Sequence, residues 1–129
     1  VTYQGHGPYD TEEVWRGDHY TDGRYSTETA NIVDNYLGSV ADTAEQLAVL
    51  VDRLRQEERP VVLVVFGDHK PWLGYSNSAY QELGVNLDTA TEEGFYNYYS
   101  TRYLIWANDA AKEALGEDFV GLLLDESAL

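Results

Sequence analysis

The chain has 129 residues, which suits one domain or one part of a larger domain. Eight Lys and Arg residues against 23 Asp and Glu residues give a formal net charge of −15, which argues against binding to nucleic acid or to an anionic lipid surface. The sequence has no run of about 18 apolar residues that would predict a membrane span or a secretory signal. It also has no cysteine, which excludes disulfides, thiolate metal ligands and a cysteine nucleophile.

The first 25 residues predict a short strand followed by a long loop. Residues 1–4 can form the strand, and the two glycines and the proline of residues 5–9 force an irregular turn. Residues 10–25 are polar and predict a loop, and loops of this length usually carry function or move.

Residues 26–58 predict a helix, because apolar residues recur there at steps of four and three. The apolar stripe consists of Val33, Leu37, Val40, Ala44, Leu47, Val51 and Leu54, and charged residues such as Asp34 lie off it. Ser26 or Thr27 suits the N-cap, and Pro60 ends the segment. Gly38 and Ser39 mark a weak point at which two helices could meet.

The second half of the chain predicts two strands and two short helices. Every residue of 61–66 is apolar and most are β-branched, which is typical of a central parallel strand that is covered on both faces. Residues 103–107 predict a second strand, residues 86–94 a loop, and residues 119–124 a third apolar run of undetermined type. Short helices are expected at 78–83, closed by Gly84, and at 110–115, between Asn108 and Gly116. This order favours an α/β fold with a mixed, mostly parallel sheet that is flanked by helices.

Asp68 and His69 follow the predicted buried strand directly after Gly67, where α/β sheets place their ligands. A carboxylate and an imidazole that converge there supply the oxygen and nitrogen donors that suit Zn²⁺ or Mn²⁺. The alternative is an ordinary turn in which Asp68 caps backbone amides and His69 is hydrogen-bonded. A second Gly-Asp-His, at residues 17–19, has no strand before it and is interpreted as part of a solvated loop.

His6 lies between two glycines that allow a ligand to approach the backbone closely. It could bind a phosphoryl oxygen or protonate a leaving group, or it could bond only to a local carbonyl. Trp15, Trp72 and Tyr75 could line a sugar or glycerol site, or they could simply pack. The chain contains no G-x-S-x-G elbow, no P-loop and no G-x-G-x-x-G.

Four segments carry a family resemblance, in the family's order and spacing: YQGHGPY at 3–9, YLGSVAD at 36–42, VVFGDHKPWLG at 64–74 and YSTRYLIWAN at 99–108. Over roughly residues 1–116 the chain resembles the C-terminal part of the lipoteichoic acid synthase and phosphoglycerol transferase group. These enzymes are sulfatase-like members of the alkaline phosphatase superfamily. The resemblance implies that residues 1–129 form a single partial domain of a sulfatase-like catalytic domain, with residues 117–129 unaligned.

The resemblance also implies a metal centre and a substrate contact. Asp68 and His69 would be two ligands of one divalent cation, usually Mn²⁺, with Mg²⁺, Zn²⁺ or Ca²⁺ as alternatives. His6 would contact the phosphate of phosphoglycerol or of a related anionic ester. The family uses a metal-activated Thr nucleophile, which this chain lacks, and passes the group to an acceptor hydroxyl or to water. Because catalytic sites of this kind have three protein ligands and an open position, we expect the chain alone to be inactive.

The resemblance places the parent protein at the extracytoplasmic face of the bacterial cell membrane, and this segment itself is expected to be soluble. Transferase, phosphatase and sulfatase activities are not distinguished. Exposed strand edges would favour a homodimer. A first alternative is a non-catalytic module that binds a glycan, an anionic headgroup or a protein through Tyr and Trp. A second, phosphate acceptance by Asp68, is disfavoured because the chain lacks an early acidic cluster for Mg²⁺.

Overall fold

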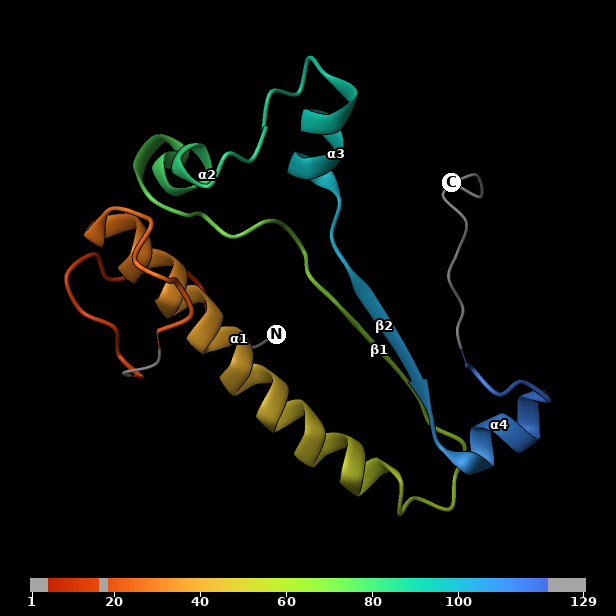
Figure 1. The fold of residues 1–129 in the computed structure, drawn as a ribbon. Coiled ribbons are helices and arrows are strands. Elements are labelled where there is room, and N and C mark those ends of the chain that lie inside the picture. Colours follow the sequence, from red (N-terminus) through yellow and green to blue (C-terminus); the bar gives the residue numbers. More distant parts are fainter. Residues whose placement is uncertain (1–4, 17–18, 121–129) are drawn as a thin grey trace. The chain divides into compact units, whose positions relative to one another are not determined.

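A computed structural model describes residues 5–16 and 19–120 of the chain (Figure 1). The chain divides into two compact units, Val1–Ala48 with Asp68–Thr101 and Val49–Gly67 with Arg102–Leu129. The strand predicted at 1–4 and most of the apolar run predicted at 119–124 lie outside the described residues. Within the described part of the chain, no helix combines the length and the apolar character that crossing a bilayer requires.

Helix α1 (Thr27–Leu54) is one continuous helix of 28 residues, so the predicted break at Gly38 and Ser39 is wrong (Figure 1). Gly38 serves close packing instead. Arg16 donates from a guanidinium nitrogen to the Gly38 carbonyl at 3.0 Å, and a Cβ at position 38 would lie 3.3 Å from Arg16 Cδ. The predicted N-cap is confirmed, because the Thr29 backbone N–H donates to Ser26 Oγ at 3.2 Å.

The core of the first unit joins the N-terminal half of α1 to the segment that follows Trp72. Its buried residues are Ile32, Val33, Leu73, Ala79 and Tyr80. Tyr80 donates its hydroxyl to the Pro71 carbonyl at 2.9 Å. Burial, with the nearby Tyr36 and Tyr9 as lesser causes, raises the pKa of Tyr80 to about 12.

Two short helices complete the first unit. Helix α2 (Ser78–Glu82) follows a 3₁₀ turn at Tyr75–Asn77, and Gly84 closes it at a φ of 72°, as the sequence predicts. Helix α3 (Glu92–Tyr99) overlaps the predicted 86–94 loop, so the loop prediction is wrong for its last residues. The Thr91 hydroxyl caps α3 by accepting from the Gly94 N–H at 3.1 Å, and two glutamates occupy the first turn, where the helix dipole favours negative charge.

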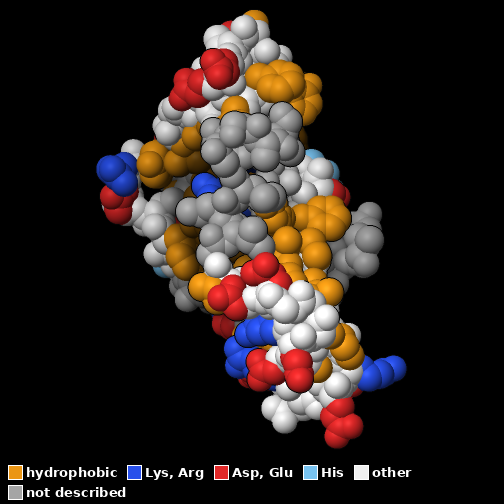
Figure 2. Space-filling view, turned by 90° about the vertical axis from the view of Figure 1, so that its right-hand side faces the viewer, with side chains coloured by type: hydrophobic (Ala, Val, Ile, Leu, Met, Phe, Trp, Pro, Cys, Tyr) orange, Lys and Arg blue, Asp and Glu red, His pale blue; other side chains and the backbone are white. Residues whose placement is uncertain are grey.

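The second unit contains a two-stranded antiparallel sheet of β1 (Val62–Phe66) and β2 (Tyr103–Ala107). Val62 pairs with Ala107 and Phe66 with Tyr103. The expectation of a mostly parallel sheet with β1 covered on both faces is therefore not borne out. An all-apolar strand indicates that both of its faces favour burial, which is common in parallel sheets, but the pattern does not fix the direction of the neighbouring strand. Alternate β1 residues are exposed, with Phe66 at 69%. Hydrophobic side chains are visible at several places on the face of the molecule drawn in Figure 2.

Helix α4 (Asp109–Leu115) ends the described fold and confirms the predicted caps. The Asn108 side chain accepts from the Ala111 N–H at 3.0 Å, and Gly116 adopts a left-handed conformation after the helix. Asn108 is buried and also donates to the carbonyls of Glu57 and Arg59. These bonds tie the start of α4 to the segment that precedes β1.

Candidate functional site

Asp68 and His69 lie side by side in the first unit, with Asp68 Oδ2 at 3.7 Å from His69 Nε2. The other ring nitrogen of His69, Nδ1, lies 2.7 Å from the Lys70 carbonyl oxygen. Because a carbonyl can only accept, Nδ1 carries the proton and Nε2 carries the lone pair in the neutral ring. The side chains are 81% and 61% exposed, so a cation can reach both donor atoms.

The ordinary-turn alternative finds partial support. His69 is hydrogen-bonded to a neighbouring carbonyl, as that alternative expects. The 3.7 Å between Asp68 Oδ2 and His69 Nε2 is an ion pair only when the ring is protonated. In the neutral ring, the carboxylate oxygen and the imidazole nitrogen are two adjacent donor atoms that a metal ion accepts.

His6 lies close to this pair, although it comes from the N-terminal loop. Its ring centroid is 6.2 Å from that of His69, with the two ring planes nearly perpendicular. His6 Nδ1 lies 2.7 Å from the Gly7 carbonyl oxygen, so the same tautomer follows for this ring. The structure therefore brings His6, Asp68 and His69 together in one place.

His6 also lines a pocket of about 190 Å³. Its walls are Gly5, His6, Pro8, Tyr9, Asp10, Trp15, Asn35 and Ser39. Gly5 passes close to α1, since a Cβ at that position would lie 2.8 Å from Ser39 Oγ. Tyr9 donates its hydroxyl to the Gly5 carbonyl at 2.6 Å, which closes the loop. Of the three aromatic residues predicted for a sugar site, Trp15 lines this pocket, whereas Trp72 and Tyr75 do not.

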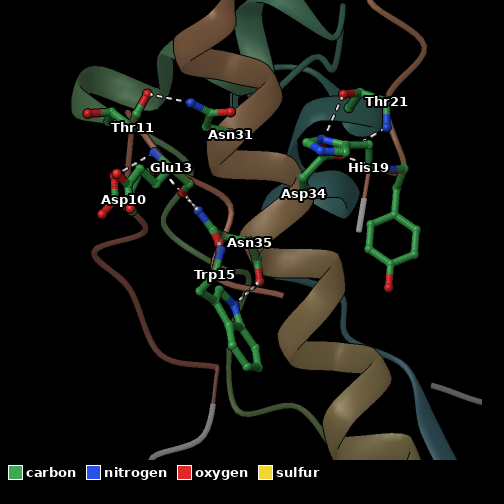
Figure 3. A network of polar contacts seen from close by, with 10 residues as sticks. Asp10, Thr11, Glu13, Trp15, His19, Thr21, Asn31, Asp34 and Asn35 are labelled. Carbon is green, nitrogen blue, oxygen red and sulfur yellow. Dashed lines mark hydrogen bonds and ion pairs between the residues drawn. The ribbon is translucent and has the colours of Figure 1, made fainter. Parts of the chain in front are cut away.

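Asn35 of α1 holds the loop that forms one wall of the pocket (Figure 3). Its Oδ1 accepts from the Trp15 backbone N–H at 2.9 Å, and its Nδ2 donates to the carbonyls of Asp10 at 3.1 Å and Glu13 at 2.7 Å. Asn35 is not among the residues that the sequence predicts for the site. The available signal was an asparagine inside a long helix, where its propensity is poor and its side chain readily bonds to backbone.

Asp34, the residue before Asn35, holds the following part of the same loop. The carboxylate is buried and accepts from the backbone N–H groups of Tyr20 at 3.0 Å and Thr21 at 2.9 Å. His19 Nδ1 lies 3.4 Å from its Oδ2 (Figure 3). In the second Gly-Asp-His, the histidine therefore contacts a buried carboxylate, while Gly17 and Asp18 lie outside the described residues.

Asp68 and His69 fit a divalent cation in chemistry but do not enclose one. They offer one carboxylate oxygen and one imidazole nitrogen, which Mn²⁺ and Zn²⁺ both accept. Across residues 5–16 and 19–120, no group of three or more His, Asp or Glu side chains is arranged to hold a metal ion. The described residues therefore provide at most part of a coordination shell.

Comparison with known proteins identifies related sequences. The family described as Sulfatase matches residues 1–122. The chain is similar to a putative cyclic beta-1,2-glucan modification protein of Rhizobium meliloti (strain 1021), with 26% identity over 111 residues. That alignment covers 84% of this chain and 17% of the relative, so the chain spans about one sixth of the relative's length. No solved structure matches the chain.

Proposed function

This chain belongs to the sulfatase family, and from that premise we propose that it forms part of the active site of a metal-dependent enzyme acting on phosphate or sulfate esters. The observation that carries the proposal is the convergence of His6 with Asp68 and His69. The substrate would be phosphoglycerol or a related anionic ester. The similarity to a glucan modification protein is compatible with a glycan hydroxyl as the acceptor.

Asp68 and His69 would bind the cation through Oδ2 and Nε2. The hydrogen bond from His69 Nδ1 to the Lys70 carbonyl fixes the ring orientation and keeps the lone pair on Nε2, which is the usual arrangement for a metal-binding histidine. We expect Mn²⁺, with Mg²⁺, Zn²⁺ or Ca²⁺ as alternatives. When bound, the cation would lower the pKa of a hydroxyl nucleophile and stabilise negative charge on the ester oxygens.

His6 would bind the group that is transferred. Its ring lies beside His69, and its Nδ1 is bonded to the Gly7 carbonyl. A protonated imidazole is a charged N–H donor. Such a charged donor binds a phosphoryl or sulfuryl oxygen and can protonate a leaving alkoxide. The remaining ligands and a Thr nucleophile would come from other residues of the natural polypeptide, because two ligands leave most of the shell open.

We also propose that the natural polypeptide works at the extracytoplasmic face of the bacterial membrane. Self-association through the exposed face of β1, which includes Val64 and Phe66, stays a prediction that sedimentation of the chain can test.

A non-catalytic binding module is the second candidate, and exposed aromatic side chains on α3 favour it. Phe95 and Tyr99 have ring centroids 4.7 Å apart, Tyr98 and Tyr99 4.9 Å apart, and all three are largely exposed. Such a surface suits a glycan or a protein. A module of this kind would bind its ligand without metal-dependent turnover.

Metal-dependent hydrolysis of a phosphodiester and of a sulfate ester by the natural full-length polypeptide tests the proposal. Asp68→Asn and His69→Gln should abolish the metal-dependent rate, and His6→Gln should lower it by about 100-fold or more. His19→Gln is the control and should retain the rate, because His19 pairs with Asp34. Full metal-dependent turnover in Asp68→Asn would refute the proposal.

A further inference from the structure

We infer that the pocket beside His6 binds a neutral polyol, namely a glycerol unit or one sugar ring, with the Trp15 indole as its stacking surface and the Asp10 carboxylate as its hydroxyl acceptor. The inference rests on the proposed function, because this polyol would be the alcohol part of the ester or of the acceptor. Beyond the proposed function, the inference names the chemical class of ligand that the pocket recognises and assigns Trp15 and Asp10 as residues that determine specificity.

The size and the lining of the pocket match a small polyol. Its volume of about 190 Å³ lies below the range of about 300 to 1,000 Å³ that is typical of sites for drug-sized ligands. The lining combines two aromatic residues, Trp15 and Tyr9, with two polar residues, Asp10 and Ser39. A polyol needs this combination, since it presents C–H groups on its faces and hydroxyl groups at its rim.

Trp15 is fixed in place before a ligand arrives. Its backbone N–H bonds to Asn35 Oδ1 at 2.9 Å, and its indole Nε1 points to the Asn35 carbonyl at 3.5 Å (Figure 3). The neighbouring Arg16 is also held, through the Gly38 carbonyl and through Glu45 at 3.2 Å. The Arg16 guanidinium carbon lies 5.9 Å from the centroid of the Trp15 ring, and Trp15 is still 56% exposed, so it is not a core residue. A rigid, exposed indole at a pocket wall binds with little entropic cost.

Asp10 is held as an ionised acceptor. Its Oδ1 accepts from the backbone N–H groups of Glu12 at 2.8 Å and Glu13 at 3.1 Å, and these bonds hold the pKa of the carboxyl below its usual range. Both bonds use Oδ1, which leaves Oδ2 to accept from ligand hydroxyls. Hydrogen bonds to a charged acceptor are about twice as strong as neutral ones.

The same charge sets the direction in which an ester would bind. A carboxylate in the pocket repels a phosphate or a sulfate. His6 lies at the boundary, since it lines the pocket and also approaches His69. The alcohol part of an ester would therefore enter the pocket, and its anionic group would remain beside His6, Asp68 and His69.

Binding of glycerol and of methyl β-glucoside to the natural full-length polypeptide, in EDTA, tests the inference separately from any metal chemistry. We expect the Trp15 indole N–H resonance to shift with one or both ligands. Trp15→Ala and Asp10→Asn should each weaken the binding by about tenfold or more. Asp10→Asn keeps an Oδ1 that can accept from Glu12 and Glu13, so the loop should keep its conformation and the effect should report on Oδ2.

Trp72→Ala and Asp22→Asn are matched controls outside the pocket and should bind normally. A response to glycerol alone assigns the glycerol unit, and a response to the glucoside alone assigns the sugar. The inference is overturned if neither ligand shifts the Trp15 indole, or if Trp15→Ala and Asp10→Asn bind as the unmodified protein does. Polyol binding in a protein that lacks metal-dependent turnover would contradict the proposed function and leave the pocket assignment in place.

Discussion

Replacing Asn35 by alanine should destabilise the first unit and release the loop that forms the pocket wall. The Asn35 side chain is buried and makes three hydrogen bonds to loop backbone groups, at Trp15, Asp10 and Glu13. At about 1 kcal/mol for each bond, the loss would reach about 3 kcal/mol. Because the loop lies at the surface, water can bond to the freed backbone groups and offset part of this loss. We therefore expect the free energy of unfolding to fall by about 2 to 3 kcal/mol.

Urea denaturation followed by far-UV circular dichroism measures the change in the free energy of unfolding, and amide exchange at Trp15 measures the release of the loop. Asn31→Ala is the matched control, since Asn31 lies on the same helix and makes one hydrogen bond to the described part of the loop, to the Thr11 carbonyl at 2.8 Å. Asn31→Ala should lower the free energy of unfolding by clearly less than Asn35→Ala does. Equal destabilisation by the two variants, with Trp15 exchange unchanged in Asn35→Ala, would refute the reasoning.

Three further outcomes follow from the structure. Hydrogen bonds from the Thr29 side chain and from the Ser26 backbone and hydroxyl lower the pKa of Glu82. The contribution of Glu82 to stability is therefore present above about pH 4.5 and is lost as the pH falls through the lowered pKa. Glu82→Gln should remove this pH dependence from acid titrations followed by circular dichroism. The raised pKa of Tyr80 means that stability is lost as the pH rises from about 10 to about 12, and Tyr80→Phe should remove one late-titrating phenol from the ultraviolet absorbance titration. The isolated chain should hydrolyse phosphate and sulfate esters no faster with Mn²⁺ than without it.

Local rules predicted the helices and strands better than they predicted the sheet. The caps at Ser26, Gly84, Asn108 and Gly116 act through neighbouring backbone groups, so the sequence contains the information that fixes them. Helix α3 was missed in part because its cap, Thr91, precedes a tyrosine-rich segment of modest helix propensity. The direction of β1 depends on its pairing with β2, which is far away in sequence.

The candidate site was predictable to the extent that it depends on residue type. Asp68 and His69 are adjacent in sequence, so a turn after Gly67 suffices to bring them together. The approach of His6 depends on tertiary packing, and it was expected only from the family resemblance. Asn35 and Asp34 were missed because a polar residue inside a helix looks solvated until a loop is known to cover it.

Broadening of the histidine resonances by Mn²⁺ tests the central claim most directly. The chain has three histidines, so each imidazole can be followed separately as substoichiometric Mn²⁺ is added. We predict that the signals of His69 and His6 broaden first, that His19 is affected much less, and that Asp68→Ala removes the selectivity. Equal broadening of all three histidines, or selective broadening that persists in Asp68→Ala, would contradict a cation site at Asp68 and His69.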